Sequence, residues 1–200
     1  DLAGRPQLIK GDTQLLFAGM GRLSENTMLN IKNKSHSVTA EIEVPDTGAE
    51  GVIVAQGANI GGWTLYASGG KLKYCYNLGG VQHFFTESDQ AIPSGEHQVR
   101  MEFAYDGGGL AKGGDVTLYV DGQKVGEGRV EATAPNIFSA DDGCDVGADT
   151  GAPVSPDYPP MDNAFTGRVK GVLMSIAEST QEQTHEITPE EAIRIALARQ

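Results

Sequence analysis

Short stretches that alternate apolar with polar residues run through most of this chain, and turns rich in glycine separate them. Residues 37–44 show the pattern clearly, because one side carries Val38, Ala40, Ile42 and Val44. A period of two places successive side chains on opposite faces of an extended strand, so this stretch predicts a half-buried β-strand. Residues 97–105 alternate in the same way. The chain is therefore expected to fold mainly from strands.

Turn residues divide the chain into many such strands. Further strands are predicted at residues 51–56, 62–67, 71–77, 81–88 and 165–176. Asp121-Gly122 suits the positive φ angles of a type I′ hairpin turn, and Ser68-Gly69-Gly70 predicts a second hairpin. Eight or more short strands without intervening helices are typical of a two-sheet antiparallel β-sandwich. We expect this all-β class, with the jelly roll as its topology.

The length of 200 residues suits one domain with an extension at each end. We expect a connector and edge strands in residues 1–32, the sandwich in 33–177, and a linker with a short C-terminal helix in 178–200. The helix is predicted from the capping box Thr188-Pro-Glu-Glu191, after which Ala192, Ile193, Ala196 and Leu197 form an apolar stripe.

Charge and hydropathy exclude two kinds of partner. The formal net charge is -12, and the 15 lysines and arginines are dispersed along the chain. Phosphate contacts need clustered basic residues, so neither a nucleic acid nor an anionic lipid surface is expected as a partner. No apolar run approaches the roughly 20 residues that span a bilayer, so we expect a soluble protein without a membrane span.

Residues 60–77 hold the only tryptophan and three of the six tyrosines. Parity along the two strands puts Trp63 on the face that also carries Tyr74 and Tyr76, which predicts a core hairpin. Tyr66 falls on the opposite face and is the aromatic residue expected to remain available to a partner. Because aromatic rings with a polar tip can bind sugars, Tyr66 and Trp63 are the candidate ligand-binding residues, with a place in the core as the alternative.

Four aspartates lie within nine residues, in a region rich in glycine. They are Asp141, Asp142, Asp145 and Asp149. Oxygen ligands in a segment full of turns are what Ca²⁺ prefers, although the spacing does not match an EF-hand loop. The sequence therefore favours an exposed acidic loop that supplies turns, with a calcium site at these four aspartates as the alternative.

Other chemistries find no support in the residue pattern. The glycine-rich residues 106–115 lack the spacing of a phosphate-binding loop, and no histidine or serine spacing suggests a catalytic triad. No cluster of histidine and cysteine residues suggests zinc. Cys75 and Cys144 are either two free thiols or a pair across the sandwich. No catalytic residue is expected.

Three longer motifs are specific enough to compare with a family. They are GAEGVIVAQG at 48–57, FAYDGGG at 103–109 and DVGADTGAPV at 145–154. These and other segments between about residues 1 and 177 resemble the C-terminal region of large bacterial arylsulfatases. In that family the region is a concanavalin A-like or laminin G-like β-sandwich that follows the catalytic domain. The resemblance implies the same fold for this chain.

The catalytic motif of that family is missing here. Sulfatases convert the first residue of C/S-x-P-x-R into formylglycine, but neither Cys75, Cys144 nor any serine begins such a motif. The resemblance therefore implies a non-catalytic accessory domain that packs on a catalytic sulfatase domain of the same polypeptide and shapes substrate access. A glycan or sulfated substrate is a further expected partner, and the bacterial cytoplasm and periplasm both stay open as compartments. The alternative is a carbohydrate-binding β-sandwich module.

Overall fold

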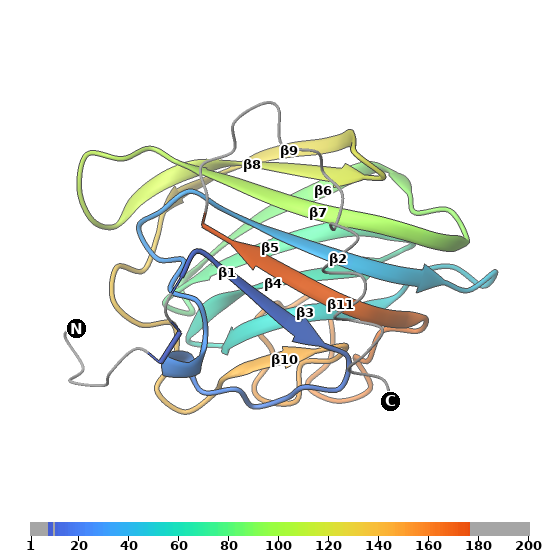
Figure 1. Cartoon of the computed structure of the whole chain (residues 1–200), viewed down its shortest axis with the longest axis horizontal. Coiled ribbons are helices and arrows are strands. Elements are labelled where there is room, and N and C mark those ends of the chain that lie inside the picture. Colours follow the sequence, from blue (N-terminus) through green and yellow to red (C-terminus); the bar gives the residue numbers. More distant parts are fainter. Residues whose placement is uncertain (1–7, 10, 177–200) are drawn as a thin grey trace.

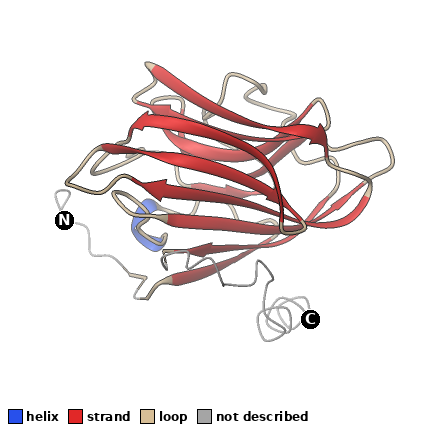
Figure 2. Cartoon of the chain, turned by 90° about the horizontal axis from the view of Figure 1, so that it is seen from above, coloured by secondary structure: helices blue, strands red, loops and turns tan. Residues whose placement is uncertain are grey.

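Two antiparallel sheets lie face to face in the computed structural model, which describes residues 8–9 and 11–176 of the chain (Figure 1). Figure 2 shows the same two layers from above, with strands in red and one short 3-10 helix, η1 (Glu25–Thr27), in blue. The expected fold class, an all-β two-sheet sandwich, is confirmed. The short helix predicted in 178–200 lies outside the described residues.

The first sheet contains six strands. In spatial order they are β1 (Thr13–Phe17), β11 (Arg168–Ser175), β2 (His36–Val44), β7 (Gly95–Tyr105), β8 (Lys112–Val120) and β9 (Gln123–Ala132). Every neighbouring pair is antiparallel. The strand at residues 13–17 is thus an edge strand of the sandwich, whereas residues 28–31 form no strand and bury Met28, Leu29 and Ile31 in the core.

The second sheet contains five strands. In spatial order they are β10 (Cys144–Val146), β3 (Gly51–Ala58), β4 (Gly61–Ser68), β5 (Lys71–Leu78) and β6 (Gln82–Ala91). β3 to β6 form a meander of hairpins, and β10 returns from a distant part of the chain to pair with β3. The alternating pattern did not predict β10, because only three residues pair inside a loop rich in aspartate and glycine.

Two hairpin turns form where the sequence predicts them. Asp121 and Gly122 both have positive φ angles, 50° and 75°, as a type I′ turn between β8 and β9 requires. Gly69 and Gly70 have φ angles of 60° and 78° between β4 and β5. These turns fix the register, so Trp63 pairs with Tyr76 and Leu65 with Tyr74.

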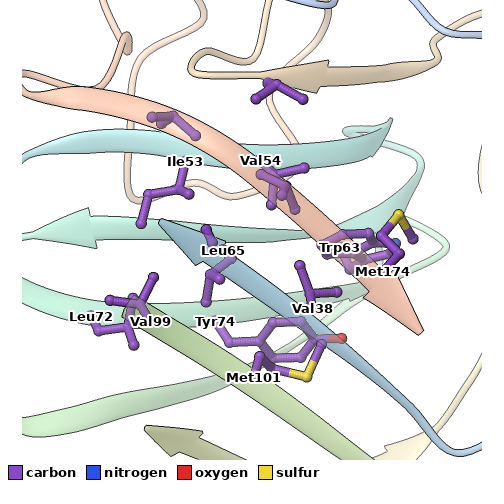
Figure 3. Packing of buried hydrophobic residues seen from close by; sticks show 14 of the residues in the cluster. Val38, Ile53, Val54, Trp63, Leu65, Leu72, Tyr74, Val99, Met101 and Met174 are labelled. Atoms are coloured by element: carbon purple, nitrogen blue, oxygen red, sulfur yellow. The ribbon is translucent and has the colours of Figure 1, made fainter. Parts of the chain in front are cut away.

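The hydrophobic core fills the space between the sheets (Figure 3). Alternate residues of β2 and β7 point inward from one sheet, and alternate residues of β4 and β5 point inward from the other. They include Val38, Ala40, Ile42, Trp63, Leu65, Leu72, Tyr74, Val99 and Met101. The predicted core hairpin is confirmed, since these side chains are almost fully buried.

No helix within the described ranges is long and apolar enough to cross a membrane.

Candidate functional site

Trp63 lies inside the core and presents no surface to a ligand. Its exposed fraction is 0%, and its indole Nε1 donates a hydrogen bond to Gln56 Oε1 at 3.0 Å. The buried donor is therefore satisfied on the neighbouring strand β3. The alternative that assigned Trp63 to the core is the one the structure supports.

Residues 147–167, here called the covering loop, cover the outer face of the five-stranded sheet over β3, β4 and β5. Val154 and Tyr158 of this loop form a small apolar cluster with Val52, Ala55, Tyr66 and Cys75 of the sheet. The Tyr66 ring packs edge-on against the Tyr158 ring at 5.3 Å, and the exposed fraction of Tyr66 is 0%. The expectation that Tyr66 remains available to a partner is therefore wrong. The alternating pattern placed the Tyr66 side chain on the correct face of the sheet, but a segment far away in sequence covers it there.

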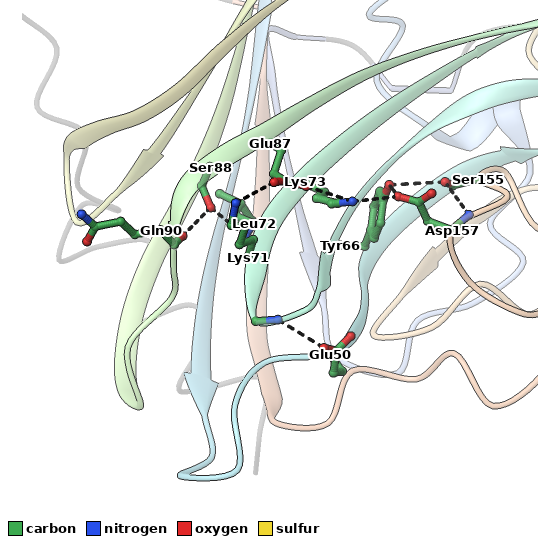
Figure 4. A network of polar contacts seen from close by, with 11 residues as sticks. Glu50, Tyr66, Lys71, Leu72, Lys73, Glu87, Ser88, Gln90, Ser155 and Asp157 are labelled. Carbon is green, nitrogen blue, oxygen red and sulfur yellow. Dashed lines mark hydrogen bonds and ion pairs between the residues drawn. The ribbon is translucent and has the colours of Figure 1, made fainter.

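A chain of charged and polar groups holds the covering loop on the sheet (Figure 4). The Tyr66 hydroxyl donates to Asp157 Oδ2 at 2.6 Å, and Lys73 Nζ lies 3.2 Å from the same oxygen. Lys71 and Lys73 both contact Glu87, and these two ammonium groups hold the pKa of its carboxyl below the usual range. The contacts join β4, β5 and β6 to the loop.

Phe85 is the aromatic side chain that this face leaves accessible. It lies on β6 opposite Cys75, is 45% exposed, and stacks beside His83 with ring centroids 6.2 Å apart. Of the six tryptophan, tyrosine and phenylalanine residues between 63 and 85, five are buried or half-buried. Phe85, and not Tyr66 as predicted, is therefore the accessible one.

A pocket of about 200 Å³ opens where β10 pairs with β3. Three stretches of chain form it: residues 22–25 before and within η1, Gly57 at the end of β3, and residues 139–151 around β10. The side chains that line it are Arg22, Ser24, Glu25, Ser139, Asp141, Asp142, Asp145 and Thr150. We call it the acidic pocket, since four of these side chains are carboxylates.

Hydrogen bonds hold both carboxylate oxygens of Asp145 in the acidic pocket. Its Oδ1 accepts a hydrogen bond from the Arg22 backbone N–H at 2.5 Å. Its Oδ2 accepts from the backbone N–H and the hydroxyl of Thr150, at 2.8 and 2.7 Å. Asp145 thus ties the start of the chain to the covering loop and fixes two walls of the pocket.

Asp141 and Asp142, two further carboxylates of the pocket, accept fewer hydrogen bonds than Asp145 does. Asp142 Oδ2 accepts only a long hydrogen bond, 3.4 Å, from the Ala152 N–H. Asp141 is exposed, and its carboxylate has no hydrogen-bond partner among the residues that the structure describes. These two side chains therefore keep acceptor capacity for a ligand.

Glu25 also lines the pocket, although no sequence pattern indicated this. Its carboxylate pairs with Lys32 at 2.5 Å and accepts from the backbone N–H groups of Phe138 and Ser139, at 3.1 and 3.4 Å. The two backbone partners, Phe138 and Ser139, are 113 and 114 residues away along the chain. No local pattern reports such a contact, since it exists only once the sandwich has formed.

Asp149, the fourth predicted aspartate, does not line the pocket. Its carboxylate lies inside the covering loop, where it accepts from the Val154 N–H at 2.9 Å and from the Tyr158 hydroxyl at 2.7 Å. Burial raises the pKa of this carboxyl, partly offset by these hydrogen bonds. The structure therefore gives Asp149 a structural role within the loop.

The four predicted aspartates do not fit one calcium ion as a set. Within the described ranges, no group of three or more histidine, cysteine, aspartate or glutamate side chains lies close enough to hold a metal ion. Calcium binding through Asp141 and Asp142 stays a prediction. Calorimetric titration with CaCl₂ tests it: heat that Asp142→Asn removes supports a site, and the absence of heat contradicts one.

Both cysteines are free and buried. Burial raises the pKa of the Cys75 thiol to about 12. Of the two alternatives for these residues, the structure shows two free thiols.

Solved structures share this fold at low sequence identity. No protein-family model and no curated protein matches the sequence. The CBM40 module of a Ruminococcus gnavus IT-sialidase, solved with α2,3-sialyllactose, is similar with a TM-score of 0.53 and 10% identity, over 94% of this chain and 96% of that one. Its complex with α2,6-sialyllactose gives 0.52 and 10%, over 92% and 96%.

Domains LG4-5 of the mouse laminin α1 chain are similar with a TM-score of 0.49 and 17% identity, over 86% of this chain and 42% of that one. This chain thus spans less than half the length of that laminin fragment. At such identities the likeness concerns the fold alone. The chain is a two-sheet antiparallel β-sandwich of the jelly-roll type, a fold that it shares with the CBM40 module.

Proposed function

We propose that this protein is a non-catalytic module that binds a glycan in the acidic pocket. One observation carries the proposal: a pocket of about 200 Å³ is lined by seven residues whose side chains carry oxygen atoms, namely Ser24, Glu25, Ser139, Asp141, Asp142, Asp145 and Thr150. A sugar presents several hydroxyl donors, and carboxylates are strong acceptors for them. The fold is similar to that of the CBM40 modules that bind sialyllactose, and this similarity supports glycan binding.

The composition of the pocket supports binding without catalysis. Among the described residues, no histidine or cysteine lines it. Glu25 and Asp145 are occupied by backbone N–H groups, so they act as structural acceptors. A pair of carboxylates that hydrolyses a glycoside would instead face each other across the scissile bond.

A glycan array followed by calorimetry tests the proposal. We expect Asp142→Ala to abolish the heat of binding. We expect Gly151→Ala to weaken it, because a β-carbon on Gly151 would lie 2.7 Å from Asp142 Oδ1. Asp46→Ala, at the exposed turn between β2 and β3, is the matched control. The absence of any glycan ligand, or pocket variants that bind like the wild type, would contradict the proposal.

A second candidate is an accessory domain that packs on an arylsulfatase catalytic domain of the same polypeptide. The sequence resemblance supports it, and so does an exposed apolar end of the sandwich. Ile60, Val81 and Ile137 are 59%, 86% and 41% exposed. The loops that carry these three residues lie against one another. A β-carbon placed on Gly80 would lie 2.8 Å from Asn59 O, and one placed on Gly61 would lie 2.7 Å from Phe138 O. An apolar patch of this kind suits a protein surface.

Association with the missing domain tests this candidate. The module is added to the separately produced catalytic domain, and complex formation and aryl sulfate hydrolysis are measured. We expect Ile60→Ser with Val81→Ser to weaken the complex. Leu110→Ser, which changes another exposed apolar residue on the β7–β8 loop, should leave it intact. No complex, or equal effects of the two changes, would contradict the candidate.

A further inference from the structure

We infer that the acidic pocket selects uncharged glycans and discriminates against sulfated or carboxylated ones. The inference rests on the proposed glycan-binding function and names its ligand class. Two features of the pocket support it. Most of the backbone N–H groups around the pocket already donate to protein oxygens, and most of the charged side chains that line the pocket are carboxylates.

The backbone donors around the pocket are largely taken by the pocket's own oxygens. The N–H groups of Arg22 and Thr150 donate to Asp145, and those of Phe138 and Ser139 donate to Glu25. The N–H groups of Asp141 and Asp142 are 3.3 and 3.2 Å from the Ser139 hydroxyl oxygen. An anion bound by a protein usually needs such N–H groups free and convergent. Here they stabilise the walls instead.

The carboxylate oxygens that are not yet hydrogen-bonded favour a ligand that carries hydrogen-bond donors. Asp141 has no partner among the described residues, and Asp142 has only one long hydrogen bond. Sugar hydroxyls can donate to both carboxylates. A sulfate ester or a sugar carboxylate offers further acceptors, which these groups cannot satisfy.

The local charge has the same sign as an anionic ligand. Four carboxylates line the pocket, against the single basic residue Arg22. Lys32 pairs with Glu25 but is not part of the lining. The whole chain carries a net charge of -12, so the wider field also opposes an anion. An uncharged glycan avoids this repulsion.

A set of matched ligands tests the inference. Neutral oligosaccharides are compared with their own sulfated forms, and lactose with sialyllactose, each in EDTA and in CaCl₂. We expect the neutral member of each pair to bind more tightly, by about tenfold or more, because juxtaposed like charges are strongly disfavoured. Preference for the charged member, with or without calcium, overturns the inference and leaves the glycan-binding function standing. Binding of no ligand overturns both.

A charge reversal separates electrostatic selection from shape. Asp141→Lys replaces an exposed carboxylate that holds no other described residue, so the fold should be unaffected. We expect it to reduce or reverse the preference for neutral ligands. Asp46→Lys makes the same charge change at the turn before β3, six or more residues of strand away from Gly57, and should leave the preference unchanged. An unchanged ratio in Asp141→Lys would overturn the inference.

Discussion

His36 is buried at the start of β2 with one ring nitrogen unpartnered. Its Nδ1 lies 3.0 Å from Lys34 O, whereas its Nε2 has no hydrogen-bond partner among the described residues. The ring is 8% exposed and packs 5.1 Å from the Phe103 ring. Burial, partly offset by the bond to Lys34, lowers the pKa of His36 from 6.5 to about 4.

This shift makes stability depend on pH. Because the folded-state pKa lies below the unfolded-state value, the unfolded chain binds the proton more tightly. The free energy of unfolding is therefore unaffected by His36 above pH 6.5 and decreases as the pH falls from 6.5 towards 4. The full loss is about 3 kcal/mol, since each pKa unit corresponds to about 1.4 kcal/mol.

Denaturant unfolding of His36→Phe tests this prediction. We expect the variant to lose less stability than the wild type between about pH 7 and about pH 4.5, because the phenyl ring cannot be protonated. His83→Gln, which changes a histidine on the outer face, should behave like the wild type. Equal losses in all three proteins would contradict the prediction.

Individual side chains show where sequence reasoning succeeds and where it stops. Parity assigned Trp63 and Tyr66 to opposite faces correctly, because the period of a strand is a local property. It could not give the exposure of Tyr66, whose hydroxyl contacts Asp157, 91 residues further along the chain. Burial by a remote loop has no local signature.

Among the larger elements, the covering loop depends on a few buried polar contacts. Asp149 accepts from Val154 and Tyr158, and Asn163 Nδ2 donates to the backbone oxygens of Asp149 and Pro159, both at 2.9 Å. These contacts give a loop without regular structure a fixed shape. The loop can then bury the apolar outer face of the sheet.

Removing the Asp149 carboxylate should loosen this loop. Asp149→Ala leaves the Val154 N–H buried without an acceptor and removes the carboxylate that accepts from the Tyr158 hydroxyl, at a cost of about 1–3 kcal/mol. We expect a lower melting temperature and faster reaction of Cys75 with a thiol reagent, because Cys75 lies under Val154 and Tyr158. Met161→Ala, at an exposed position of the same loop, is the control. A thiol that stays unreactive in Asp149→Ala would contradict the prediction.

Strands were easier to predict than the segments that join the two sheets. The alternation and turns of residues 36–132 predict β2 to β9, because hairpins are built from neighbouring segments. β10 pairs with β3 across 88 to 92 residues of sequence, from Cys144 opposite Gln56 to Val146 opposite Val54, and its three residues contain too little pattern to stand out. The acidic pocket depends on this pairing. The sequence therefore indicated three of its aspartates but neither Glu25 nor the pocket itself.

For the molecule as a whole, the first and last described strands are direct neighbours. β1 lies at the edge of the six-stranded sheet and pairs antiparallel with β11, with Thr13 opposite Ser175 and Phe17 opposite Gly171. Positions 13 and 175 thus lie side by side at one end of this pair. Hydrogen bonds between antiparallel strands run perpendicular to them.

This arrangement makes the resistance of the protein to mechanical force depend on direction. A pull between Gly11 and Ile176 loads the Thr13–Ser175 end first, so the bonds break one after another and the sheet unzips at low force. A pull between Ala18 and Ile176 acts along the two strands and loads all their bonds together. Single-molecule force measurements with handles at these positions should show the lower rupture force for the first pair, and equal forces would contradict the arrangement. Tension along the polypeptide would therefore peel β1 from β11 while the core between the sheets is still closed.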